Sequence, residues 1–181
     1  MKNLKLTIDL VPETAWGENL RKLLRASDWD ILRHTAYEKT NHKCSICETP
    51  SDNLEAHEVW NYDISFKTQT LTDIIALCKS CHFVKHIRQA KRIGAEKHAQ
   101  SHFLKINNCG FDTFASHFLE AEQLLKDSSK VEEWTLVLPP EIEELSKLKI
   151  IRKTETKEKG YVQNAEKRMR LLTKFIQKEV S

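Results

Sequence analysis

Four of the five cysteines form two Cys-x-x-Cys pairs, separated by thirty residues. The pairs are Cys44 with Cys47 and Cys78 with Cys81. Thiolates bind zinc well, and two such pairs supply the four ligands of a closed tetrahedral site. The alternative, a set of free or redox-active thiols, does not explain why four of five cysteines are paired. The sequence therefore predicts a structural Zn²⁺ site.

Three histidines accompany these cysteines. His82 directly follows Cys81, and His86 comes four residues later, so in a helix the two side chains share one face. His57 lies between the cysteine pairs in residues 53–60, which we expect to form a strand paired with residues 69–77. A hairpin that carries one histidine and a helix that carries two would build a second metal site, provided that the helix begins at the second cysteine pair.

The pattern from Cys44 to His86 resembles the core of HNH endonucleases. Its parts are Cys-Ser-Ile-Cys, Leu-Glu-Ala-His and Asp-Ile-Ile-Ala-Leu-Cys-Lys-Ser-Cys-His-Phe-Val-Lys-His. The resemblance is specific over residues 44–86, looser over about 16–138 and absent beyond. It implies an α+β, mostly helical fold with a ββα-metal core, a four-cysteine zinc site, flanking helices and a C-terminal helical extension. We expect an HNH-like zinc-binding domain at 1–140, with its core at 44–92, and a basic helical extension at 141–181.

The resemblance also implies roles for individual residues. In this family the hairpin supplies a metal ligand followed at once by a general-base histidine, an asparagine near the second strand supports the active loop, and the helix supplies further ligands. Carried over to this chain, Glu58 stands at the base position and Asp73 at the asparagine position. The catalytic-metal ligands are then His57, His82 and His86.

Glu58 is the main departure from the family pattern. A carboxylate with an unperturbed pKa of about 4.3 is a weaker base than imidazole unless burial raises its pKa. In an alternative register His57 is the base, but Ala56 would then occupy the preceding ligand position and offers no ligand atom. We favour the register in which His57 is a ligand.

Two functions remain open from the sequence. The first is a metal-dependent endonuclease that hydrolyses DNA phosphodiester bonds with a second divalent metal: imidazole ligands favour Zn²⁺, Ni²⁺ or Mn²⁺, and open coordination positions leave room for Mg²⁺. The second is a catalytically impaired HNH-like zinc protein that binds nucleic acid or a protein partner, as a phage or defence-system inhibitor would. In that case Glu58 closes the second site as a fourth ligand, or the site holds no metal.

Charge is distributed unevenly along the chain, although the net charge is only +3. Residues 79–105 hold seven Lys and Arg against one Glu, a net charge of +6, whereas residues 106–145 hold two Lys against nine acidic residues, a net charge of −7. Basic side chains that neutralise phosphates supply most non-specific affinity for nucleic acid. The ordinary alternative is a solvated helix face. The predicted nucleic-acid-binding residues are Lys79, Lys85, Arg88, Lys91 and Arg92.

The overall composition sets broader limits. The 181 residues are 40% hydrophobic and 30% charged, which is typical of a soluble, helix-rich protein. No apolar run approaches the roughly 18 residues of a membrane span, so we expect no membrane association. Paired cysteines without a secretory signal favour a reducing cytoplasm. Cys109, the unpaired cysteine, is most simply a small buried residue.

Two outer segments also carry patterns. Residues 4–10 alternate between apolar and polar, which predicts a strand that could pair with residues 134–138. The last helix carries Ala165, Met169, Leu172 and Ile176 on one face, and such a face must pack against its own domain, a second copy or another protein. We interpret His98 and His102, again four residues apart, as non-ligands because no nearby cysteine or acidic residue accompanies them in the sequence.

Overall fold

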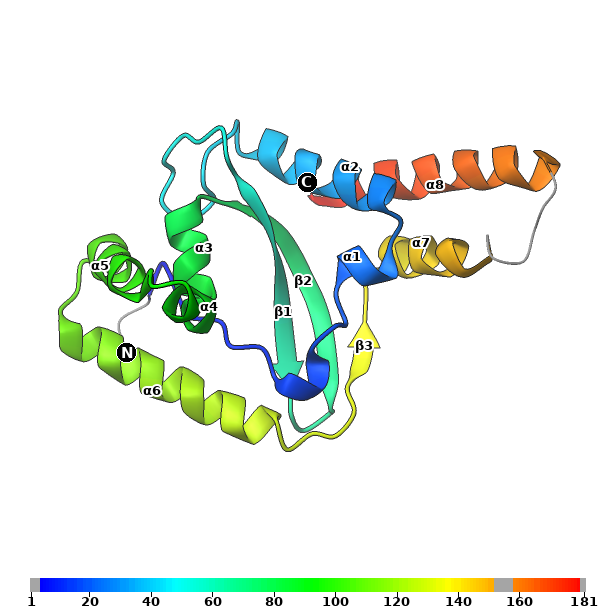
Figure 1. Cartoon of the computed structure of the whole chain (residues 1–181). Coiled ribbons are helices and arrows are strands. Elements are labelled where there is room, and N and C mark those ends of the chain that lie inside the picture. Colours follow the sequence, from blue (N-terminus) through cyan, green and yellow to red (C-terminus); the bar gives the residue numbers. More distant parts are fainter. Residues whose placement is uncertain (1–3, 152–157, 180–181) are drawn as a thin grey trace.

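The computed structural model describes residues 4–151 and 158–179, and it is α+β and mostly helical, as expected (Figure 1). Its elements in chain order are η1 (Glu13–Ala15), α1 (Leu20–Leu23), α2 (Ala26–Lys39), β1 (Glu55–Asp63), β2 (Thr68–Leu77), α3 (Lys79–Lys85), α4 (Ile87–Arg92), α5 (Glu96–Asn107), α6 (Phe111–Ser128), β3 (Thr135–Val137), α7 (Pro140–Ile151) and α8 (Glu158–Glu179). No helix in these ranges is both long and apolar enough to cross a bilayer.

A long antiparallel hairpin of β1 and β2 lies at the centre of the molecule (Figure 1). The short strand β3 pairs in parallel with β2, so the sheet order is β1-β2-β3 and β1 is an edge strand. His57 is opposite Ile75, and Glu58 is opposite Ile74. Because successive side chains of a strand point to opposite faces, His57 and Glu58 lie on different faces of the hairpin.

Each face of the hairpin is covered by its own hydrophobic cluster. Ile75 packs into the cluster that includes Val84, Ile87 and Phe103, from α3, α4 and α5. Ile74 belongs to the second cluster, which is formed with α1, α2, α7 and α8. The alternation of β2 therefore sends consecutive residues into two cores, and it directs His57 toward α3 and Glu58 toward α1 and α2.

The helix predicted from residue 80 to 92 is two helices. His86 adopts φ −106° and ψ 52°, which is not helical, and it separates α3 from α4. The His86 amide still donates to the His82 carbonyl oxygen at 3.0 Å. One turn of helical spacing is thus kept between the two histidines, and the chain changes direction only after His86.

The prediction of a strand over residues 4–10 is wrong, although its alternation correctly places Leu6 and Ile8 in the core. The backbone groups here are paired by individual residues of the helices instead of by a strand. The Leu6 amide donates to the Asn107 side-chain oxygen, and the Asn107 side-chain amide donates back to the Leu6 carbonyl. The Ile8 amide donates to Nε2 of His117. Strand β3 pairs with β2 and not with this segment.

The C-terminal helices pack on the same chain. Leu172 and Phe175 of α8 are buried in the cluster with α2 and β2, whereas Met169, expected on the apolar face, is 55% exposed. Leu171 also packs against this cluster. Residues 152–157 and 180–181 of the expected extension lie outside the described residues, and the division of the chain at residue 140 stays a prediction.

Candidate metal centre and adjoining cleft

The four paired cysteines converge, as predicted. Their sulfur atoms all lie within 4.8 Å of one another, and Sγ of Cys47 is 3.6 Å from Sγ of Cys78. A tetrahedron with Zn–S bonds of about 2.3 Å has edges of about 3.8 Å. The group therefore has the chemistry and spacing to hold a zinc ion.

Backbone hydrogen bonds bring the two cysteine pairs together. Ser45 follows Cys44, and its amide donates to the Ala76 carbonyl at 2.8 Å. The Ala76 amide donates in turn to the Ser45 hydroxyl. These bonds attach the first cysteine pair to the end of β2, immediately before Cys78.

The pKa values of two of the clustered cysteines are shifted in opposite directions. The hydrogen bond with Cys81 lowers the pKa of Cys44 to about 4. Burial, together with the neighbouring sulfurs, raises the pKa of Cys78 to about 11. A bound cation would relieve this repulsion between sulfurs. Nε2 of His102 lies 3.2 Å from Sγ of Cys81, so this histidine contacts the group, although the sequence indicated no partner for it.

The structure also brings together the three histidines of the predicted second site. One ligand atom each from His57, His82 and His86 lies within 4.8 Å of the others. Burial lowers the pKa of His82 and lowers the pKa of His86 to about 3. The rings of His82 and His86 are therefore neutral at physiological pH, which is the state in which imidazole binds a metal.

Two carboxylates that sequence reasoning missed contact these histidines. Glu55 pairs with Nδ1 of His82, and Oδ2 of Asp9 lies 3.4 Å from Nε2 of His57. Strand alternation provides a signal for Glu55, because it lies two residues before His57 on the same face of β1. No sequence signal identifies Asp9, which comes from the segment wrongly predicted as a strand.

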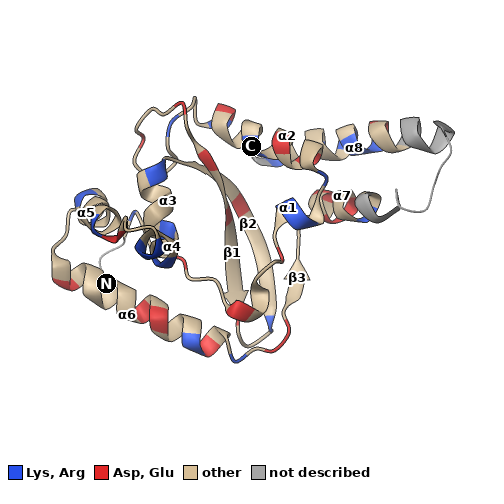
Figure 2. Cartoon of the chain, in the orientation of Figure 1, with Lys and Arg blue, Asp and Glu red and all other residues tan. Residues whose placement is uncertain are grey.

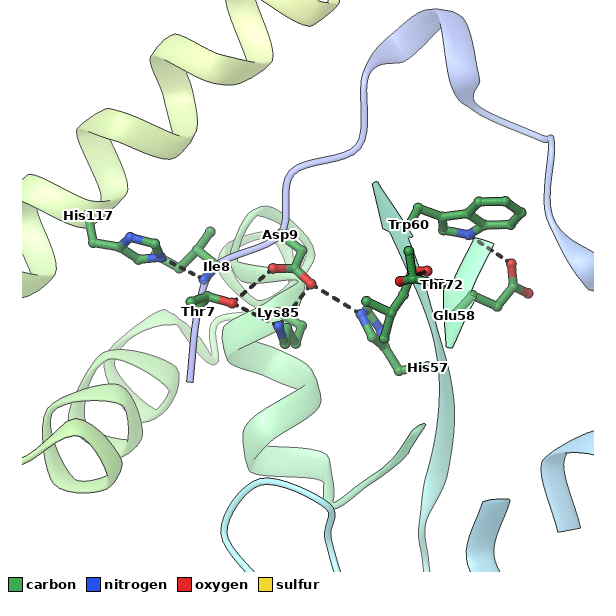
Figure 3. Close-up of polar contacts among 10 residues, drawn as sticks. Thr7, Ile8, Asp9, His57, Glu58, Trp60, Thr72, Lys85 and His117 are labelled. Atoms are coloured by element: carbon green, nitrogen blue, oxygen red, sulfur yellow. Dashed lines mark hydrogen bonds and ion pairs between the residues drawn. The ribbon is translucent and has the colours of Figure 1, made fainter. Parts of the chain in front are cut away.

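Glu58 lies apart from the three histidines. Its carboxylate accepts hydrogen bonds from the Leu20 amide at the start of α1 and from Nε1 of Trp60 at 3.0 Å. Figure 3 shows Glu58 beside Trp60, away from Asp9 and His57. Burial raises the pKa of Glu58, although both hydrogen bonds oppose the shift. Asp73 is the second carboxylate predicted for the site. Its Oδ1 accepts a hydrogen bond from the amide of the next residue, Ile74, at 2.7 Å.

A cleft of about 1500 Å³ runs along the edge strand β1. Because β1 is paired on one side only, side chains from both of its faces line the cleft, including His57 and Glu58. His82 and His86 line it as well. Arginines from different helices contribute to its walls: Arg21, Arg33, Arg88 and Arg92.

The five basic side chains predicted to bind nucleic acid differ in their surroundings. Lys85 is 8% exposed, and its Nζ lies 2.9 Å from Oδ2 of Asp9. Arg88 donates two hydrogen bonds to Glu122 on α6, at 3.0 and 2.6 Å. Figure 2 shows Lys and Arg on α4 and acidic residues along α6. Arg88 is nevertheless exposed, and so are the remaining three: Lys79, Lys91 and Arg92. A role in nucleic-acid binding stays a prediction.

No protein-family model, curated protein or solved structure matches this chain. The chemistry of the site must therefore be inferred from its own residues.

Proposed function

We propose that the chain is a metal-dependent endonuclease of the HNH type, which hydrolyses DNA phosphodiester bonds at the His57–His82–His86 group. The observation that carries the proposal is this group of three converging histidines, placed on an open cleft beside a separate four-cysteine group. Catalytic metal sites have three protein ligands and leave a position free, whereas structural sites are closed by four.

The three imidazoles would hold Zn²⁺, Ni²⁺, Mn²⁺ or Mg²⁺, and a divalent ion there would supply Lewis-acid stabilisation of the charge on the scissile phosphate and the leaving oxygen. Glu58 does not join them as a fourth ligand: its carboxylate is held by Leu20 and Trp60 on the other face of β1. This placement argues against a site closed by Glu58.

Glu58 is the proposed general base. It takes a proton from water as the water oxygen attacks phosphorus and the bond to the leaving 3′ oxygen breaks. His57 and Glu58 line the same cleft along the edge strand β1, so a phosphodiester bound along this edge would meet His57 from one face and Glu58 from the other. The raised pKa of Glu58 brings its basicity closer to that of imidazole.

Cleavage of supercoiled plasmid tests the proposal. The wild type would be assayed with each of the four metals beside His57→Ala, Glu58→Gln and the control His34→Ala, which replaces an exposed histidine of α2. We expect metal-dependent nicking by the wild type and the control, and a loss of 100-fold or more in the other two variants. A wild type that retains one zinc but leaves plasmid intact with every metal would refute the nuclease assignment.

The second candidate is an HNH-like scaffold that binds nucleic acid or protein without cleaving it. The hydrogen bonds of Glu58 favour this candidate, because they also join α1 to the hairpin and give the residue a purely structural use. Plasmid retained in a gel-shift assay without being nicked would support binding. In the nuclease, Glu58→Gln should abolish cleavage and leave plasmid binding unchanged.

A further inference from the structure

The N-terminal segment reaches the histidine group through Asp9. His57 is 5% exposed, and its Nε2 lies 3.4 Å from Oδ2 of Asp9 (Figure 3). An ionised carboxylate only accepts hydrogen bonds, so the proton of this contact belongs to Nε2 of His57. A neutral imidazole with its proton on Nε2 has its lone pair on Nδ1.

Asp9 is held firmly in this position. Nζ of Lys85 lies 2.9 Å from the same carboxylate oxygen that faces His57. The Thr7 hydroxyl lies 3.2 Å from the other carboxylate oxygen, and the Asp9 amide donates to the Lys85 carbonyl at 3.1 Å. The carboxylate is therefore paired with the Lys85 ammonium, and its Oδ2 faces His57.

A second histidine of the group has the same kind of partner. Glu55 pairs with Nδ1 of His82, which leaves Nε2 of that ring for a metal. Metal-binding histidines usually donate their other ring N–H to a carboxylate or carbonyl, and this contact fixes the tautomer and the ring orientation. Glu55 on β1 and Asp9 in the N-terminal segment thus contact two of the three histidines.

We propose that Asp9 is a positioning residue of the second metal site, which holds the His57 proton on Nε2 and so presents Nδ1 to the metal. The inference rests on the metal site of the proposed function and extends it to residues 4–10, outside the stretch from Cys44 to His86. Asp9 itself is not a ligand in this arrangement, because its Oδ2 already contacts both His57 and Lys85.

The first test reads the tautomer directly. Long-range ¹H–¹⁵N NMR of the full chain, with zinc in the cysteine site and no second metal, distinguishes a protonated Nε2 from a protonated Nδ1. We expect His57 protonated on Nε2 in the wild type and in the control Thr7→Val, which alters the same segment but keeps Asp9. Asp9→Leu should lose this preference. A wild-type His57 protonated on Nδ1 would overturn the proposal.

The second test measures metal affinity by titration with Co²⁺, followed by visible absorbance. Loss of a supporting contact lowers metal affinity by about 10–100-fold, which we expect for Asp9→Leu. Asp9→Asn keeps an accepting oxygen and should lose less Co²⁺ affinity than Asp9→Leu. If near-UV circular dichroism shows that Asp9→Leu does not fold, the affinity of Asp9→Asn decides the test. Unchanged affinity in both folded variants would overturn the positioning role. Co²⁺ binding that depends on Asp9, without plasmid cleavage, would refute the proposed nuclease activity and still support the positioning role of Asp9.

Discussion

The ion pair between Arg168 of α8 and Asp28 of α2 should contribute to the stability of the fold, because it joins these two helices. Asp28 is fully buried at the start of α2, and the Arg168 guanidinium pairs with both of its carboxylate oxygens. Nη2 of Arg168 also donates to the Ser27 hydroxyl at 3.0 Å. Removing one partner of a buried pair leaves an uncompensated charge, which costs about 3–5 kcal/mol. For a chain of this size that cost lowers Tm by roughly 6–20 °C.

We therefore expect Arg168→Ala to lower the free energy of unfolding by about 3–5 kcal/mol in urea denaturation. The double variant Asp28→Ala, Arg168→Ala should lose less free energy of unfolding than Arg168→Ala, because it leaves no unpaired buried charge at this position. Lys167→Ala is the control: its partner Glu144 is 3.2 Å away, both side chains are exposed to solvent, and an exposed pair of this kind contributes little to stability. If Arg168→Ala behaves like Lys167→Ala, α8 is not docked as described and the reasoning fails.

Three further predictions concern the other half of the molecule. Phe103 of α5 is 0% exposed in the core that also contains Cys44 and Cys81, so Phe103→Ala should lower the free energy of unfolding by about 3–5 kcal/mol in urea denaturation with an unchanged m-value. A loss under 1 kcal/mol would contradict this packing. His117 accepts the Ile8 amide, and burial lowers its pKa, so the folded state binds fewer protons than the unfolded state and stability must fall as pH drops below about 6.5. His117→Gln keeps an acceptor without titrating, so the urea midpoint measured from pH 7.5 to 5.5 should fall less than in the wild type, and an equal fall would exclude His117 as a source. His102 contacts Sγ of Cys81, so His102→Phe should weaken zinc binding about 10–100-fold in a competition assay with a chromophoric chelator, and unchanged affinity would show that the contact does not support the zinc site.

The local part of the site could be predicted from the sequence because short-range geometry determines it. Two Cys-x-x-Cys pairs can meet at one ion, and a helix that starts at the second pair places His82 and His86 one turn apart. The alternation of residues 4–10 likewise predicted that Leu6 and Ile8 are buried. It failed to predict the hydrogen bonding, because a strand needs a partner strand and Asn107 and His117 satisfy this backbone instead.

Only the tertiary structure decided which distant groups meet. Asp9 contacts His57, which is 48 positions away in the sequence, and Glu58 accepts a hydrogen bond from α1. Arg168 pairs with Asp28, which is 140 positions away. These contacts follow from the order of the strands and from the two cores on either face of the hairpin, which no local pattern encodes. Residue types and spacing thus determined the candidate ligands, whereas long-range packing determined their carboxylate partners, the open edge of β1 and the cleft beside it.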